Sequence, residues 1–173
     1  MVWRTIARTL RHRPLTVAPE AVSDAATQDL ADRLAAASQR RLGRSLAIRL
    51  VDAGSCNGCE LEINMLNGIV YDLERFGLRF VASPRHADVL LVTGPITRNM
   101  QDALLRTYNA TPDPKFVVAV GDCAVDGGVF KGSYAIHGGV DSTVPVDLVV
   151  RGCPPTPAQL LEGLRLLLEA NAQ

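Results

Sequence analysis

From residue 45 onward, short apolar runs alternate with longer segments in which apolar residues recur at helical spacing. Two of the runs, 89–92 and 116–120, contain only apolar residues. Such runs are typical of strands buried on both faces of a parallel sheet. We expect five strands, at residues 46–51, 78–82, 88–93, 115–120 and 146–151. The pattern predicts a parallel sheet that is covered on both sides.

The segments between the strands have the features of helices. One helix is expected at residues 58–76, where Gly77 would end it, and another at residues 98–109. A C-terminal helix is expected to begin after Thr156, a residue type that caps helices, with Pro157 at its first position. Alternating strands and helices indicate an α/β domain with a flavodoxin-like parallel sheet and helices on both faces.

The first 45 residues differ in pattern from the rest of the chain. Basic residues stand opposite apolar ones near the N-terminus, and an alanine-rich helical stretch follows through about residue 42. The basic residues are Arg4, Arg8, Arg11, His12 and Arg13, and the apolar ones are Val2, Trp3, Ile6 and Leu10. We therefore predict an N-terminal helical arm, residues 1–45, and a domain at residues 46–173. A basic amphipathic segment can lie on a membrane surface or dock on a membrane-embedded partner, and we expect partner docking.

Composition narrows the possible functions. The chain has 173 residues, of which 47% are hydrophobic, so it has enough apolar residues for one domain core. Its formal net charge is +0, so the chain lacks the excess of positive charge that is typical of proteins that bind nucleic acid. Charged residues interrupt every apolar stretch before the roughly 20 residues that a transmembrane helix needs. Because no signal sequence is evident either, we expect a cytoplasmic location in which thiols stay reduced.

Four cysteines stand at the ends of apolar runs, each close to a glycine. Cys56 and Cys59 form a Cys-x2-Cys pair after the first predicted strand, whereas Cys123 and Cys153 follow two later strands. The carboxyl ends of parallel strands meet at the sheet edge where ligands bind. Cys59 would lie in the first turn of a helix, where backbone N–H groups favour negative charge such as that of a thiolate-ligated iron–sulfur cluster. The spacing predicts one metal site built from three loops.

Other interpretations of the cysteines remain open. A structural zinc site or buried unreactive thiols would use the same residue type. A thiol-redox pair at Cys56 and Cys59 is a further alternative, but it leaves Cys123 and Cys153 unexplained. Glycine pairs at residues 127–128 and 138–139 could suggest phosphate loops, but the sequence has no Walker or dinucleotide-binding motif.

Four segments together resemble a known family, with the order and spacing of their motifs as well as their residue types. They are residues 52–62 (DAGSCNGCELE), 83–94 (SPRHADVLLVTG), 114–123 (PKFVVAVGDC) and 152–157 (GCPPTP). They look like the small electron-transfer subunit shared by respiratory complex I and membrane-bound (group 4) nickel–iron hydrogenases. The resemblance covers about residues 46–170.

The resemblance implies a cofactor and partners. By resemblance, Cys56, Cys59, Cys123 and Cys153 bind a single 4Fe-4S cluster, the last in an electron chain, at the interface with a large catalytic subunit. A ferredoxin-like iron–sulfur subunit would exchange electrons with it, and membrane-embedded subunits would hold the complex at the cytoplasmic side of the cell membrane, with this chain peripheral. The chain itself would perform no bond chemistry within the oxidoreductase complex.

The first cysteine pair helps to choose between branches of the family. Complex I subunits typically have two adjacent cysteines at this place, whereas hydrogenase and formate hydrogenlyase relatives have Cys-x2-Cys, as here. This favours a partner with a nickel–iron centre, and the alternative is a quinone-reducing complex. Asp122 departs from the small residue that many relatives place before the third cysteine. If it were ionised and close to the cluster, it would lower the cluster's potential.

Three further polar residues are candidates for the site. Glu60 and Glu62 follow Cys59 in the first turn of the predicted helix, and we expect both to be solvated acids. Glu60 is kept as a candidate for proton transfer, because it stands next to a predicted ligand. His137 lies in a glycine-rich loop, and the sequence does not place it relative to the cysteines.

Overall fold

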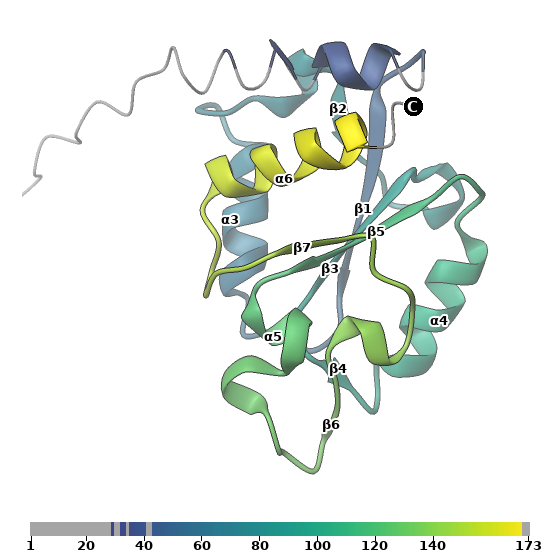
Figure 1. Ribbon diagram of the computed structural model, residues 1–173, viewed down its shortest axis with the longest axis vertical. Helices are drawn as coiled ribbons and strands as arrows, with labels where there is room; N and C mark the ends of the chain where they lie inside the picture. Colours follow the sequence, from purple (N-terminus) through teal and green to yellow (C-terminus); the bar gives the residue numbers. More distant parts are fainter. Residues whose placement is uncertain (1–28, 30–31, 34, 41–42, 171–173) are drawn as a thin grey trace, which may run out of the picture.

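The computed structural model describes residues 29, 32–33, 35–40 and 43–170. Its centre is a five-stranded parallel sheet in the order β2-β1-β3-β5-β7 (Figure 1). The strands are β1 (Leu46–Asp52), β2 (Leu78–Phe80), β3 (Val89–Thr93), β5 (Phe116–Val120) and β7 (Leu148–Val150). A separate antiparallel pair joins β4 (Ile96–Thr97) to β6 (Ile136–Gly138). The predicted parallel sheet is confirmed.

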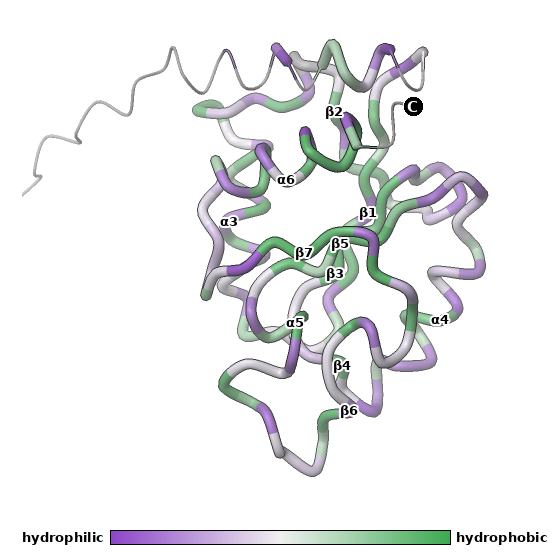
Figure 2. The backbone as a smooth tube through the Cα atoms, in the orientation of Figure 1, coloured by the Kyte–Doolittle hydropathy of each residue, from purple (hydrophilic) through white to green (hydrophobic). Residues whose placement is uncertain are grey.

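Helices cover both faces of the sheet, as predicted. On one face α3 (Gly58–Leu66) and α6 (Pro157–Ala170) pack on one cluster of buried side chains. On the other face α4 (Gln101–Ala110) and the short α5 (Asp122–Asp126) pack on a second cluster. Neighbouring residues along β3 and β5 alternate between the two clusters, as the two-residue period of a strand requires. Figure 2 shows the apolar strands running through the middle of the molecule.

The helix predicted at residues 58–76 is shorter than expected. Helix α3 ends at Leu66, and the backbone N–H groups of Asn67 and Gly68 donate to carbonyls three residues back, which tightens the last turn. Asparagine followed by glycine is a poor continuation of a helix. A 3-10 turn at Leu73–Phe76 follows, and Gly77 ends it with a φ of 75°. Helix α5, the β4–β6 pair and three further 3-10 turns, Pro84–His86, Gly128–Phe130 and Val140–Ser142, were not predicted.

The N-terminal arm is described only in part. Residues 35–40 are helical, and Ala37 is buried in the same cluster as α3 and α6. The hydroxyl of Ser38 donates to the carbonyl oxygen of Arg44, 3.0 Å away. The amphipathic segment at residues 1–13 lies outside the described residues, so the arm and its boundary at residue 45 stay predictions. Within the part of the chain that is described, no helix is both long and apolar enough to span a membrane.

Candidate metal centre

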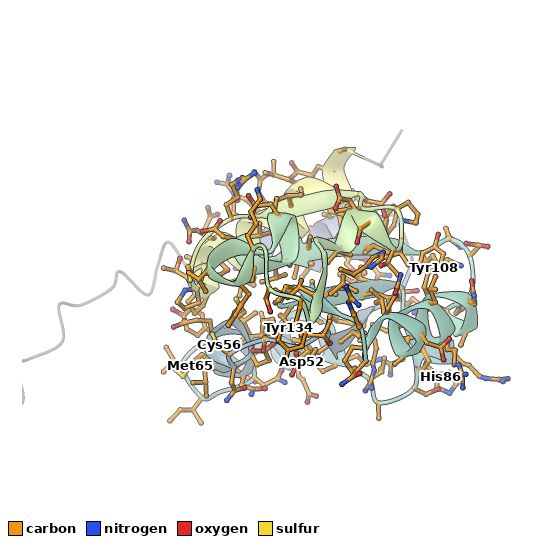
Figure 3. All side chains as sticks on the ribbon, turned by 90° about the horizontal axis from the view of Figure 1, so that it is seen from below. Asp52, Cys56, Met65, His86, Tyr108 and Tyr134 are labelled. Carbon is orange, nitrogen blue, oxygen red and sulfur yellow. The ribbon has the colours of Figure 1, made fainter. Side chains whose placement is uncertain are left out.

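The loop after β1 is shaped by a series of local hydrogen bonds. One carboxylate oxygen of Asp52, Oδ1, accepts hydrogen bonds from the backbone N–H groups two and three residues later, at 2.8 Å each. The Ser55 hydroxyl accepts one from the backbone N–H of Asn57 at 3.0 Å, and Asn57 has a φ of 71°. This turn leads directly into α3, so Cys56 lies in the loop and Cys59 in the first helical turn. Figure 3 labels Asp52, at the end of β1, and Cys56, in the loop that follows it.

The third and fourth cysteines come from two neighbouring strands. Strand β5 ends at Val120, and Cys123 follows in the first turn of α5, where it is buried. Strand β7 ends at Val150, and Cys153 follows in an exposed loop. Because β5 and β7 are paired and parallel, both loops leave the same edge of the sheet. The backbone N–H of Gly121 donates to the carbonyl oxygen of Val150 at 2.8 Å and ties the loops together.

All four cysteines line one pocket of about 80 Å³ at this edge. A single water needs roughly 10–15 Å³ measured in the same way, so the pocket has room for a group larger than one ion. Its remaining lining residues are Ser55, Gly58, Gly94, Asp122, Gly152 and Pro154. Within the described residues, no three or more His, Cys, Asp or Glu side chains converge closely enough to hold a single metal ion.

Two glycines let the backbone approach the cysteine sulfurs. A Cβ atom on Gly121 would lie 2.5 Å from the sulfur of Cys59, and a Cβ atom on Gly128 would lie 2.8 Å from the sulfur of Cys123. Both glycines also have positive φ angles, 87° and 48°. A side chain at either place would therefore push a sulfur away from its position, which explains why glycine is needed at both places.

The thiols make one another harder to ionise. Burial, with smaller contributions from the nearby Glu60 and the other three cysteines, raises the pKa of Cys59 from 9.0 to about 12. Burial also raises the pKa of Cys123, although the backbone N–H of Val129 donates a hydrogen bond that opposes the shift. Four thiolates in this pocket would be stable only if positive metal ions neutralised their charge. The donor set and the size of the pocket fit a thiolate-ligated metal cluster.

The candidate polar residues have different surroundings. The expectation that Glu60 is solvated is wrong: it is only 6% exposed, and neither carboxylate oxygen has a hydrogen-bond partner in the described structure. Glu60 is three residues before the buried Ile63, so it lies on the core-facing side of α3. Glu62 is partly exposed. His137 is exposed on β6 and does not line the pocket, whereas Asp122 does.

The hydrogen bonds that Asp52 accepts from the first loop were not predicted from the sequence. An aspartate at a strand end with glycine and serine two and three residues later is a recognisable signal for this kind of turn. Gly94 and Pro154, which also line the pocket, had no comparable signal, because their places depend on how separate loops meet.

Known proteins resemble this chain over most of its length. A family model described as the NADH ubiquinone oxidoreductase 20 kDa subunit matches residues 56–167. Formate hydrogenlyase subunit 7 from Escherichia coli (strain K12) is 46% identical over 129 residues, which are 75% of this chain and 51% of that protein. This chain therefore spans about half the length of that relative.

Two further proteins are similar over larger shares of their own length. A probable membrane-bound hydrogenase subunit, mbhJ, from Pyrococcus furiosus is 47% identical over 132 residues, covering 76% of this chain and 79% of that protein. The solved structure of the membrane-bound sulfane sulfur reductase, an archaeal respiratory membrane complex, contains a chain with a TM-score of 0.66 and 35% identity, covering 79% of this chain and 74% of that one. This chain belongs to the family of the NADH ubiquinone oxidoreductase 20 kDa subunit.

Proposed function

We propose that this chain is the electron-transfer subunit of a membrane-bound oxidoreductase complex of the nickel–iron hydrogenase type. It would hold one 4Fe-4S cluster through Cys56, Cys59, Cys123 and Cys153. The observation that supports this most strongly is that all four cysteines, which come from three strand ends, line one pocket. The sequence relatives support the kind of complex, since they include a formate hydrogenlyase subunit and a probable membrane-bound hydrogenase subunit.

A bound cluster supplies one-electron oxidation and reduction, and the residues of this chain would position it. The backbone N–H of Val129 already donates to the sulfur of Cys123, and a hydrogen bond to a ligand sulfur stabilises its negative charge. Gly121 and Gly128 keep the surrounding backbone close to the sulfurs. The chain would relay electrons and leave bond making and breaking to its partner.

The position of the pocket suggests how partners would approach. Cys56 and Cys153 are exposed, so two of the four ligands lie at the protein surface. A large catalytic subunit that covers this surface would place its nickel–iron centre within reach of the cluster. A ferredoxin-like iron–sulfur subunit would deliver or remove electrons, and membrane-embedded subunits would anchor the complex, with this chain peripheral on the cytoplasmic side.

A quinone-reducing complex is the second candidate, because the matching family model is named after a complex I subunit. The Cys-x2-Cys spacing at Cys56 and Cys59 favours the hydrogenase type. Hydrogen production or uptake by the purified complex, compared with its reduction of a quinone analogue, distinguishes the two. Quinone reduction without hydrogen turnover would replace the first candidate by the second.

The cluster itself is tested by spectroscopy and metal analysis. The complex is purified without oxygen, and electron paramagnetic resonance spectra are recorded before and after reduction with dithionite, for the native chain and for Cys123→Ser. We expect a signal of the reduced cluster that is lost or altered in the variant, with about four iron atoms per cluster as its composition requires. A sample without such a signal that contains zinc would refute the cluster and support a structural metal site. A sample with neither metal would favour a thiol-redox domain.

Glu60 is included in the proposal as a proton carrier. Its carboxyl group is buried without a hydrogen-bond partner in the described structure, and it lies directly beside Cys59. A Glu60→Gln variant has nearly the same shape but cannot exchange a proton, so it should slow turnover while the spectrum of the cluster is kept. Unchanged turnover would remove Glu60 from the proposal.

The arm is proposed to dock on a membrane-embedded partner. Deletion of residues 1–13 should release the subunit from the membrane complex and spare the cluster. Retention in the membrane fraction would contradict this role.

A further inference from the structure

We infer that Asp122 is a positioning residue that locks the third and fourth ligand loops together, and that Arg151 offsets its charge. The inference rests on the proposed cluster. Two hydrogen bonds connect Asp122 to Gly152, the residue before Cys153. The backbone N–H of Asp122 donates to the carbonyl oxygen of Gly152 at 2.9 Å. In return, the backbone N–H of Gly152 donates to the carboxylate Oδ1 of Asp122 at 3.2 Å.

This reciprocal pair lies between two predicted ligands. Asp122 directly precedes Cys123, and Gly152 directly precedes Cys153, so the distance between the two cysteines depends on how firmly their neighbours are joined. The loop that contains Cys153 is exposed and has no regular secondary structure. One of the two bonds uses the side chain of Asp122, and any residue except proline at position 122 can make the other through its backbone N–H. The carboxylate therefore adds a second attachment that a small residue could not provide.

The charge of Asp122 has a neighbour of opposite sign. The guanidinium Nη1 of Arg151 lies 3.9 Å from the same Oδ1 atom, and the two side chains are 67% and 41% exposed, respectively. An exposed pair of this kind interacts weakly, so the offset is partial. A negative charge beside the cluster stabilises the oxidised form, and a positive charge opposes this effect. Asp122 therefore acts mainly on the geometry of the two loops, with a small net effect on the potential.

Three variants in the intact complex separate these effects. Asp122→Asn keeps an oxygen that can accept the hydrogen bond from Gly152 but removes the charge, whereas Asp122→Ala removes both. Arg151→Gln removes only the positive charge. Asp102→Ala, at an exposed site on α4, is the matched control. Iron release into a chelator measures how firmly the cluster is held, and a redox titration followed by electron paramagnetic resonance measures its midpoint potential.

The expected results differ between the variants. Asp122→Ala should release iron several-fold faster than the native chain, while Asp122→Asn and Asp102→Ala should release it at the native rate. The potential should rise in Asp122→Asn and fall in Arg151→Gln, each by about a threefold change in the reduction equilibrium. This corresponds to about 28 mV for a one-electron couple, for which tenfold is 59 mV.

Two outcomes would overturn the inference while leaving the proposed function intact. One is a native complex with a normal cluster in which Asp122→Ala releases iron at the native rate. The other is equally fast release from Asp122→Asn and Asp122→Ala, because the charge and not the hydrogen bond would then hold the loops. A native complex without a cluster would instead refute the proposed function, so the two failures are distinguishable.

Discussion

Replacing Gly121 by alanine tests whether the loops around the cysteines are as tightly closed as the structure indicates. The new Cβ atom would lie 2.5 Å from the sulfur of Cys59, far inside van der Waals contact. The backbone also has a φ of 87° and a ψ of 155°, a combination that is essentially restricted to glycine and costs an alanine about 1–3 kcal/mol. Overpacking a close-packed site adds about 1–3 kcal/mol. The total loss in the free energy of unfolding should be about 2–6 kcal/mol.

Gly132 provides a control for the effect of a positive φ. Its φ of 85° is nearly the same, but a Cβ atom there would meet nothing within 4 Å. Gly132→Ala should therefore show only the loss of about 1–2 kcal/mol that the positive φ causes. A larger loss in Gly121→Ala than in Gly132→Ala reports the collision with the sulfur of Cys59 together with the ψ of 155° at Gly121.

Two measurements on the same variants check this reasoning. Urea unfolding of the isolated chain gives the loss of stability, and the electron paramagnetic resonance signal that Cys123→Ser removes gives the occupancy of this site in the purified complex. We expect Gly132→Ala to keep this signal and Gly121→Ala to lose most of it, because the alanine displaces the sulfur of a proposed ligand. Equal stability of the two variants, together with a full signal in Gly121→Ala, would refute the close approach.

Two further predictions concern stability alone. Asp88→Ala should lower the free energy of unfolding by about 1–3 kcal/mol, because the buried carboxylate accepts hydrogen bonds from Arg44 and from the backbone N–H of residue 47, and the latter would lose its partner. Urea unfolding measures this loss, and Asp102→Ala on the exposed surface should stay within about 0.5 kcal/mol of the native value. In the metal-free chain, the raised pKa of Cys59 means that stability present below pH 9.0 is lost as the pH rises toward about 12. Urea unfolding at pH 8 and pH 10 should show the lower stability at pH 10, and a Cys59→Ser variant that keeps the full pH dependence would contradict this assignment.

The sheet could be predicted well from the sequence, because its central strands are uninterrupted runs of apolar residues. The central strands β3 and β5 were predicted to within one residue, since each is an uninterrupted apolar run. The helix after Cys56 was predicted ten residues too long, because Leu73 and the residues around it continue an apolar pattern past the Asn67–Gly68 break. At Asn67 and Gly68, the poor helix-forming preference of the backbone outweighed the helical spacing of the apolar residues.

For the candidate site, the four cysteines could be identified from the sequence, but the hydrogen bonds that join their loops could not. The meeting of the loops at one edge follows from parallel strands, which could be predicted. The hydrogen bonds between Asp122 and Gly152 join residues 30 positions apart, so no local sequence pattern predicts them. The burial of Glu60 was also missed, because an acidic residue in a first helical turn is usually solvated and only the packing of α3 on the sheet reverses this.

The distribution of the cysteines over β1, β5 and β7 also has a consequence for the order of assembly in the cell. Parallel strands pair residues that are far apart along the chain, and such contacts form late because long loops must close first. The four sulfurs can converge only after β5 has joined β3 and β7 has joined β5. For the proposed cluster, this order means that iron and sulfide would be inserted after the parallel strands have paired, into a metal-free chain whose four cysteines already face one pocket.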